Sequence, residues 1–276
     1  MSKEFWFKEY HSPDHGLFFR IDRVIFQKRS EFQQIDIVES PTFGKVLILD
    51  GLVMTTDLDE FVYHEMLVHP AMTHHPDPSE ILVIGGGDGG TVREILKYPV
   101  VKEIVVCEID RAVVEASSEF LPHLSKGFND QKVKLIFEDG VKFVQRETAK
   151  RYDVIFVDSS DPVGPAAVLY GTDFIENLKR ILKDGGIVVF QSESPFTRLH
   201  IIKDLFNKLR GNFPYVSPYL APMPGYPDGT WSFLMASHER YEDPVRNCPG
   251  NLKYYNSEID RASRVLPNFI RSGLYG

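Results

Sequence analysis

Two carboxylates, Asp158 and Asp161, stand three residues apart in a segment that proline and glycine stiffen, Asp158–Pro165. Such a pair can hold an ammonium group, and one acid can accept a proton from an amine as it attacks. An alkyl ammonium has a pKa near about 10 and must lose a proton before it is nucleophilic. Carboxylates alone favour the charged amine, so desolvation or a nearby hydroxyl would have to assist. The alternative is a type I turn opened by Asp161-Pro162.

A second candidate site is the glycine-rich stretch Gly85–Gly90, which follows the apolar run Ile81–Ile84. It satisfies G-x-G-x-x-G from Gly85 onward, between a predicted strand and a predicted helix, which is the context of a nucleoside-binding turn. Glu108 ends the next predicted strand at a spacing that suits a pair of ribose hydroxyls. The alternative is a tight turn with a purely structural role.

Asp88 lies inside this glycine turn and restricts which nucleoside could bind there. Its carboxylate would repel the pyrophosphate of a dinucleotide, as well as the amino-acid carboxylate of S-adenosylmethionine if that group lay close. It would attract a cation. A nucleoside with a positively charged tail and no acid group therefore fits best. Asp88 could instead cap the following helix.

Acids also follow the later predicted strands. Asp139, with Gly140, follows the third strand, and Asp158 ends the fourth. In open α/β sheets the ligand crevice lies outside the carboxyl ends of the strands, so these acids are expected to join Asp88 and Glu108 in one acidic basin. The alternative is that each acid only caps a helix or starts a turn. That would explain any one of these four acids better than it explains all four together.

The hydrophobic pattern predicts the elements that position these residues. Strands are expected at residues 81–84, 104–107, 133–137, 154–157 and 187–190, and helices at 91–97, 112–120, 141–147 and 174–182. Apolar strands alternating with amphipathic helices are typical of a parallel sheet covered on both faces. A further helix and two strands are expected at 199–210, 215–220 and 230–236.

The chain before residue 58 has a different texture. Short alternating or β-branched runs at 18–26, 32–38 and 45–49 are separated by turn residues, which predicts a small antiparallel β-domain over 1–57. The catalytic domain is then expected over 58–276.

Composition excludes several classes of protein. The chain has 276 residues, 43% of them hydrophobic, and a net charge of −8, which weakens a nucleic-acid interpretation and would suit a cationic substrate. Many cytosolic proteins are equally acidic. No apolar run is long enough for a membrane span, and the N-terminus lacks a signal-peptide pattern. Cys107 and Cys248 form neither a disulfide framework nor a metal motif, so a cytoplasmic location is expected.

Two other enzyme classes fit poorly. His64-Glu65 begins like the zinc motif H-E-x-x-H, but Val68 occupies the second histidine position, and no metal site is predicted. His74-His75 is expected in a solvated loop. A nicotinamide dehydrogenase is disfavoured by Asp88 and by the preceding β-domain.

Taken in order, these segments resemble the spermidine synthases, the polyamine aminopropyltransferases, over essentially the whole chain. The matching segments are Phe32-Gln33, Leu49–Gly51, Asp59–Glu65, Gly85–Gly90, Glu108–Asp110, Asp139-Gly140, Asp158–Pro165 and Tyr226-Pro227. The resemblance implies a Rossmann-like, methyltransferase-type doubly wound sheet after the β-domain. It also implies transfer of the aminopropyl group of decarboxylated S-adenosylmethionine to putrescine, giving spermidine and methylthioadenosine. The resemblance implies neither a prosthetic group nor a metal. It implies that the protein forms a homodimer or a homotetramer.

The resemblance also implies residue roles. Asp158 matches the proton acceptor, Asp161 an acid that holds the acceptor amine, and Asp88 the acid that holds the donor's ammonium. The nucleoside is expected to contact Gln33, Gly85, Glu108, Asp139, Gly140 and Pro165. The substrate pocket and amine channel are expected to include Tyr63, His64, Gln191 and Tyr226.

One loop departs from the family pattern. Gly225 and Asp228 stand where Thr and Ser are expected, and an added acid near the channel could favour agmatine, spermidine or cadaverine as acceptor, or could point to solvent. A methyltransferase using S-adenosylmethionine is the alternative activity. Asp88 and the pair Asp158 and Asp161 disfavour it, because a methyl donor keeps its carboxylate. A non-catalytic nucleoside-binding protein would leave that pair unexplained.

Overall fold

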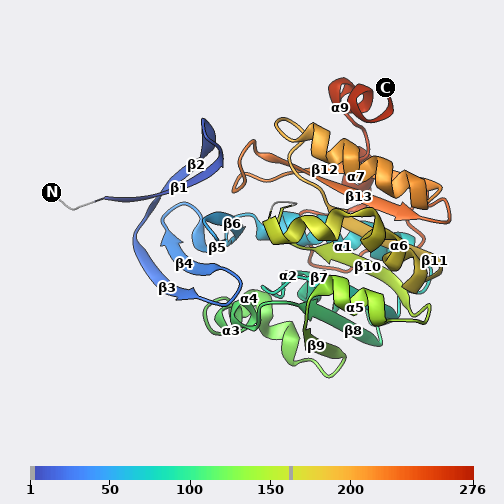
Figure 1. The fold of residues 1–276 in the computed structure, drawn as a ribbon, viewed down its shortest axis with the longest axis horizontal. Helices are drawn as coiled ribbons and strands as arrows, with labels where there is room; N and C mark the ends of the chain where they lie inside the picture. The colour runs from blue at the N-terminus through green and yellow to red at the C-terminus, as the bar shows by residue number, and fades with distance from the viewer. Residues whose placement is uncertain (1–3, 162–163) are drawn as a thin grey trace.

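The computed structural model describes residues 4–161 and 164–276, with the side chain of Pro165 also outside the description. Its larger part is a seven-stranded sheet (Figure 1). In spatial order the strands are β12 (Tyr215–Pro222), β13 (Thr230–Ser237), β11 (Leu182–Gln191), β10 (Tyr152–Asp158), β7 (Glu80–Gly85), β8 (Glu103–Glu108) and β9 (Val133–Phe137). The strands from β11 to β9 run parallel, whereas β13 is antiparallel to both its neighbours. The predicted doubly wound sheet is confirmed.

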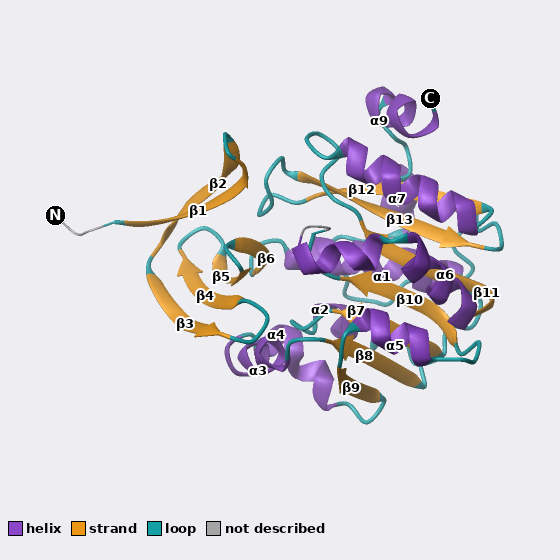
Figure 2. Cartoon of the chain, in the orientation of Figure 1, coloured by secondary structure: helices purple, strands orange, loops and turns teal. Residues whose placement is uncertain are grey.

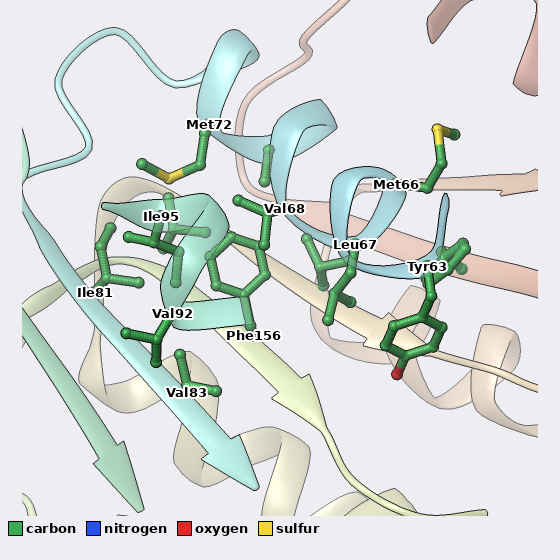
Figure 3. Close-up of a cluster of buried hydrophobic side chains, with 14 of the residues drawn as sticks. Tyr63, Met66, Leu67, Val68, Met72, Ile81, Val83, Val92, Ile95 and Phe156 are labelled. Atoms are coloured by element: carbon green, nitrogen blue, oxygen red, sulfur yellow. The ribbon is translucent and has the colours of Figure 1, made fainter. Parts of the chain in front are cut away.

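Alternation along the strands explains why helices cover both faces of this sheet (Figure 2). Ile81 and Val83 of β7 join one core with α1 (Glu60–His74) and α2 (Gly90–Ile95), the cluster shown in Figure 3. Leu82 and Ile84 face the opposite core. That second core is built from α5 (Gly140–Arg146), α6 (Thr172–Ile181), α7 (Leu199–Asn212) and α9 (Asn268–Tyr275). The other helical segments of the described residues are α3 (Arg111–Phe120), α4 (Pro122–Ser125), η1 (Lys126–Asn129), η2 (Gly164–Tyr170) and α8 (Ser257–Ser263).

The N-terminal part is antiparallel, as expected. A two-stranded hairpin, β1 (Phe5–Ser12) and β2 (His15–Ile21), precedes a four-stranded sheet of β3 (Arg23–Arg29), β4 (Gln34–Ser40), β5 (Gly44–Leu49) and β6 (Leu52–Thr56). The single run predicted at 18–26 is in fact two strands of different sheets, which separate at Asp22. Ile35, Leu47 and neighbouring side chains of the small sheet pack on Val113 and Ala116 of α3, which holds this sheet against the larger domain (Figure 1).

Helix α1 corrects one sequence expectation. His74 and His75 do not lie in a solvated loop, because α1 continues to His74 and both side chains are buried. His74 places Nδ1 2.6 Å from the carbonyl oxygen of Pro70. Among the residues described, no helix is both long and apolar enough to cross a membrane.

Candidate active site

A cavity of about 660 Å³ lies between the carboxyl ends of the parallel strands and the N-terminal sheets. Most of the predicted site residues line it, namely Gln33, Tyr63, Gly85, Asp88, Glu108, Asp139, Gly140, Asp158, Asp161, Gln191 and Tyr226. His64 does not line it, since its side chain is fully buried next to Asp88. The prediction for Pro165 concerns a side chain outside the described residues.

The glycine turn allows acids from three strands to approach one another. Gly85 has a φ of +83°, and a Cβ there would lie 2.2 Å from the carbonyl oxygen of Asp158 on the neighbouring strand. The N–H of Gly86 donates to the same oxygen (2.8 Å). A Cβ at Gly87 would lie 3.0 Å from Oε2 of Glu108. Only residues without a side chain permit this close packing.

Asp158 ends β10 with both of its carboxylate oxygens held. The Tyr63 hydroxyl donates to Oδ1 (2.8 Å) and the Thr91 hydroxyl to Oδ2 (2.6 Å). Figure 3 shows the Tyr63 ring extending from α1 with its hydroxyl at the far end. Burial raises the pKa of Asp158, and the charge of Asp88 raises it further, against the lowering effect of His64 and the two hydroxyls. A raised pKa makes this carboxylate a stronger base.

Asp88 precedes Gly89, the N-cap of α2, and it lines the cavity while its carboxylate accepts an N–H of the first helical turn. Its Oδ1 accepts the Gly90 N–H (2.6 Å) and lies 3.3 Å from Nε2 of His64. Burial tends to raise the pKa of Asp88, but the charge of His64 and the Gly90 N–H outweigh it, so the pKa is lowered. Asp88 is thus not the N-cap of α2, but its carboxylate can accept the Gly90 N–H and still attract a cation.

Among the residues predicted to contact a nucleoside, Glu108 ends β8 and Asp139 follows β9. Burial raises the pKa of Glu108 to about 7, although its Oε1 accepts the Asp110 N–H (2.8 Å). Asp139 caps α5 by accepting the Val141 N–H (2.8 Å). Gln33 donates to Oδ2 of Asp110 (3.0 Å) and so links the small sheet to this part of the cavity.

A second group of acids lines the cavity beside the β1–β2 hairpin. Nε2 of His11 lies 3.7 Å from Oδ2 of Asp161. Burial raises the pKa of Glu9 and that of Glu193 to about 7. Ligand atoms of His11, Asp161 and Glu193 lie within 4.8 Å of one another. This spacing suits an ammonium group or a metal ion. The expectation that the protein needs no metal therefore has to be tested by experiment.

Gln191 and Tyr226 line the cavity with their polar groups already engaged. Nε2 of Gln191 donates to the Tyr170 hydroxyl (2.7 Å), and its Oε1 accepts from Nε1 of Trp231 (3.1 Å). The Tyr226 hydroxyl donates to the carbonyl oxygen of Met54 (2.7 Å). Both side chains are thereby fixed as walls of the cavity.

The loop before β13 contains the two residues that depart from the family pattern. The Gly225 N–H donates to Oδ2 of Asp59 (2.5 Å). Asp228 accepts from the Thr197 hydroxyl (2.6 Å) and lies 3.1 Å from Nε2 of His15. Asp228 is not among the described residues that line the cavity. Its charge is therefore engaged by the hairpin and a neighbouring loop.

The sequence analysis missed several residues that line the cavity or hold its acids: Glu9, His11, Thr91, Glu193 and Trp231. Glu193 follows the carboxyl end of β11, so the rule that identified Asp158 could have found it. Thr91 stands in the first turn after the glycine motif. Glu9 and His11 carry no local signal, because only the fold brings the hairpin to the cavity.

Comparison with known proteins covers nearly the whole chain. Residues 60–244 match the family model described as spermine/spermidine synthase domain, and residues 5–57 match that of the spermidine synthase tetramerisation domain. The chain is 42% identical to a polyamine aminopropyltransferase of Caldicellulosiruptor saccharolyticus in an alignment of 273 residues. That alignment covers 97% of each protein. It is 41% identical to the polyamine aminopropyltransferase of Methanocaldococcus jannaschii, covering 98% of this chain and 94% of that protein.

Solved structures give the same result. A spermidine synthase crystallised with the transition-state analogue AdoDATO superposes with a TM-score of 0.94 at 39% identity, covering 98% of this chain and 95% of that one. Spermidine synthase from Thermotoga maritima superposes with a TM-score of 0.93 at 39% identity, covering 98% and 94%.

Proposed function

Because this chain belongs to the spermidine synthase family of polyamine aminopropyltransferases, we propose that it transfers the aminopropyl group of decarboxylated S-adenosylmethionine to putrescine. The products are spermidine and methylthioadenosine. The observation that carries this proposal is that Asp88, Asp158 and Asp161 line one cavity, next to a glycine turn of nucleoside-binding type. Such a cavity suits a nucleoside with a cationic tail together with a cationic acceptor.

The proposed reaction is an in-line displacement. An acceptor ammonium loses a proton to Asp158, and the neutral amine attacks the carbon beside the sulfonium. A carbon–nitrogen bond forms, the carbon–sulfur bond breaks, and methylthioadenosine leaves as a neutral thioether. The raised pKa of Asp158 reduces the gap to the pKa of the amine, and the Tyr63 and Thr91 hydroxyls fix the carboxylate for the transfer. Holding both substrates in attack geometry supplies the rest.

The second group of acids supports an acceptor that carries a second ammonium, as a diamine does. Glu9, Asp161 and Glu193 line the cavity and would attract a distal ammonium. Asp228 is paired with His15 and Thr197 outside the lining of the cavity, so it gives no reason to expect a longer or more highly charged amine.

We also propose a cytoplasmic location for the protein, in keeping with its two cysteines, which are both free.

The test is an endpoint assay by mass spectrometry. Purified protein is incubated with decarboxylated S-adenosylmethionine and, separately, with putrescine, cadaverine, agmatine or spermidine. We expect methylthioadenosine and spermidine in the putrescine reaction, at a rate that EDTA does not change. Product with another amine alone would keep the mechanism and change the acceptor. Loss of activity with EDTA would point to a metal at His11, Asp161 and Glu193.

Absence of methylthioadenosine from every reaction would contradict the proposal. The next assay would then use S-adenosylmethionine itself, to test the methyltransferase activity that the same fold could support.

A further inference from the structure

A row of charged side chains, buried at Glu60 and His64 and half-buried at its two ends, leads from Arg93 on α2 to Asp88. The guanidinium of Arg93 donates twice to Glu60, from Nη1 to Oε1 (2.9 Å) and from Nη2 to Oε2 (2.8 Å). Oε2 of Glu60 lies 2.8 Å from Nδ1 of His64. Nε2 of the same imidazole lies 3.3 Å from Oδ1 of Asp88. The row thus alternates cation, anion, cation and anion.

The burial of His64 separates it from the residues that can touch a substrate. Its side chain is 0% exposed and does not line the cavity. The ring fits only because position 90 is glycine, since a Cβ at Gly90 would lie 2.2 Å from its Cε1. A buried cation needs compensating charge, and here one carboxylate stands on each side. These two carboxylates overcome the effect of burial and raise the pKa of His64 to about 10.

For the proposed chemistry Asp88 must stay ionised throughout, whereas Asp158 must be ionised to accept the proton of the amine and then carries that proton. Two carboxyl groups that share a buried site tend to share one proton, because both cannot easily ionise together. The charge of Asp88 does raise the pKa of Asp158. An additional cation placed against only one of the two would decide which acid stays ionised. His64 occupies that place, in contact with Asp88.

Resting on the proposed function, we infer that Arg93, Glu60 and His64 form a positioning row that keeps the Asp88 carboxylate ionised to hold the donor's ammonium. Asp158 is then left as the acid that exchanges a proton with the acceptor amine. His64 acts through Asp88 and does not itself contact the substrate. The row also fixes the direction of the carboxylate, because the Gly90 N–H donates to the same oxygen that faces His64.

The groups that face His64 come from several elements. Glu60 and Tyr63 belong to its own helix α1, Asp88 to the glycine turn, Arg93 to α2 and Asp158 to β10. On the far side of Arg93 stands Glu94, which also contacts His69 and Lys97. Glu60 is itself held ionised: against the effect of burial, His64 and Arg93 lower its pKa to about 2.

Two substitutions remove the cation in different ways. Glu60→Gln takes away the charge that stabilises imidazolium, and His64→Gln removes the imidazole while leaving the pair of Glu60 and Arg93 intact. Binding of decarboxylated S-adenosylmethionine and of methylthioadenosine is measured by calorimetry without any amine. We expect donor affinity to fall about tenfold or more in each variant, since one pKa unit corresponds to a tenfold change. Methylthioadenosine, which has no ammonium, should bind nearly as before.

The pH dependence gives a readout that a merely structural role would not move. Without the cation, the pKa values of the two acids rise, so a higher pH is needed to ionise them. The acid limb of kcat/KM for the donor should therefore move upward by about one pH unit in His64→Gln. Glu60→Asp, which restores the charge, should recover part of the donor affinity.

Glu94→Gln is the matched control, because Glu94 is as buried as Glu60 and contacts Arg93 but not His64. It should lower thermal stability without changing the preference for donor over methylthioadenosine. Equal loss of both ligands in the two test variants, an unmoved acid limb, or the same loss of preference in Glu94→Gln would overturn the inference. If Glu60→Gln does not fold, His64→Gln decides the question alone. A wild-type protein that forms no methylthioadenosine would instead refute the proposed function.

Discussion

Asp158 is the residue on which the proposed chemistry depends most directly. Replacing it by Asn keeps the size of the side chain but removes the proton acceptor, so turnover should fall by about 10²–10³-fold. Methylthioadenosine affinity should stay nearly unchanged, because the nucleoside is held elsewhere. Stopped assays for kcat and calorimetry for the product measure the two effects.

The pH profile separates a proton acceptor from a residue that only shapes the cavity. The pKa of Asp158 is raised by burial and by Asp88, so its basic form is lost as pH falls through a value above that of an ordinary aspartate. The wild-type rate should decline on that acid limb, and Asp158→Asn should lose the decline that belongs to this group. Near-wild-type activity in the variant would remove Asp158 from the mechanism.

Residues with a local signature could be placed from the sequence, and others could not. Asp88 and Glu108 were located by their positions after apolar strands, and the structure brings both to one cavity. Glu9 and His11 reach the same cavity from a hairpin near the start of the chain, and nothing in their neighbours in the sequence indicates this. His64 was expected in the substrate pocket from the resemblance. Only its burial and its distance from Asp88 show that Asp88 lies between His64 and the cavity.

At the scale of helices and strands, some elements could likewise be predicted from the sequence and others could not. The parallel strands were predicted closely because each is a short apolar run between turn residues. Helix α1 was absent from the predicted helices, since every residue in it except Phe61 is buried and no polar face marks a helical period. Several of its polar side chains have partners inside the protein: Nδ1 of His64 lies 2.8 Å from Glu60, and Glu65 accepts backbone N–H groups.

Glu65 shows what one such buried polar group does for the arrangement of elements. Its carboxylate accepts the backbone N–H groups of Lys253, Tyr254 and Tyr255, each at 2.8 Å, and so fastens the segment before α8 to α1. Glu65→Ala would leave these donors without their acceptor, at a cost of about 2–3 kcal/mol. Urea unfolding at a fixed protein concentration measures this, because the stability of an oligomer depends on concentration.

Glu65→Gln serves as the control for this prediction. It retains one amide oxygen as an acceptor, so an intermediate loss of stability is expected. The KM values of both substrates should stay near wild type in the two variants, because Glu65 does not line the cavity. Unfolding of Glu65→Ala at the wild-type urea concentration would show that water or a shifted backbone replaces the carboxylate.

At the scale of the whole molecule, the N-terminal hairpin has two faces with different tasks. On its outer face, the rings of Trp6 and Phe18 lie 5.7 Å apart with 49% and 68% of these residues exposed. Paired exposed aromatics are typical of an interaction surface. Residues 5–57 match a tetramerisation domain, which supports a homo-oligomer. Glu9 and His11 of the same hairpin line the cavity.

These two faces predict that assembly and amine binding are coupled. We expect the double variant Trp6→Ser and Phe18→Ser to form smaller assemblies than the wild type, whose predicted homodimer or homotetramer would be measured by light scattering after gel filtration. An unsupported hairpin should hold Glu9 and His11 less firmly, so the KM for the amine should rise several-fold, or by about 1 kcal/mol. Methylthioadenosine affinity should not change.

Phe269→Ser, which removes an exposed aromatic ring from α9, is the control. It should alter neither the mass of the assembly nor the KM for the amine. A dissociated double variant with an unchanged amine KM would show that the hairpin keeps its place over the cavity without the partner subunits, and an unchanged mass would remove these aromatics from the interface.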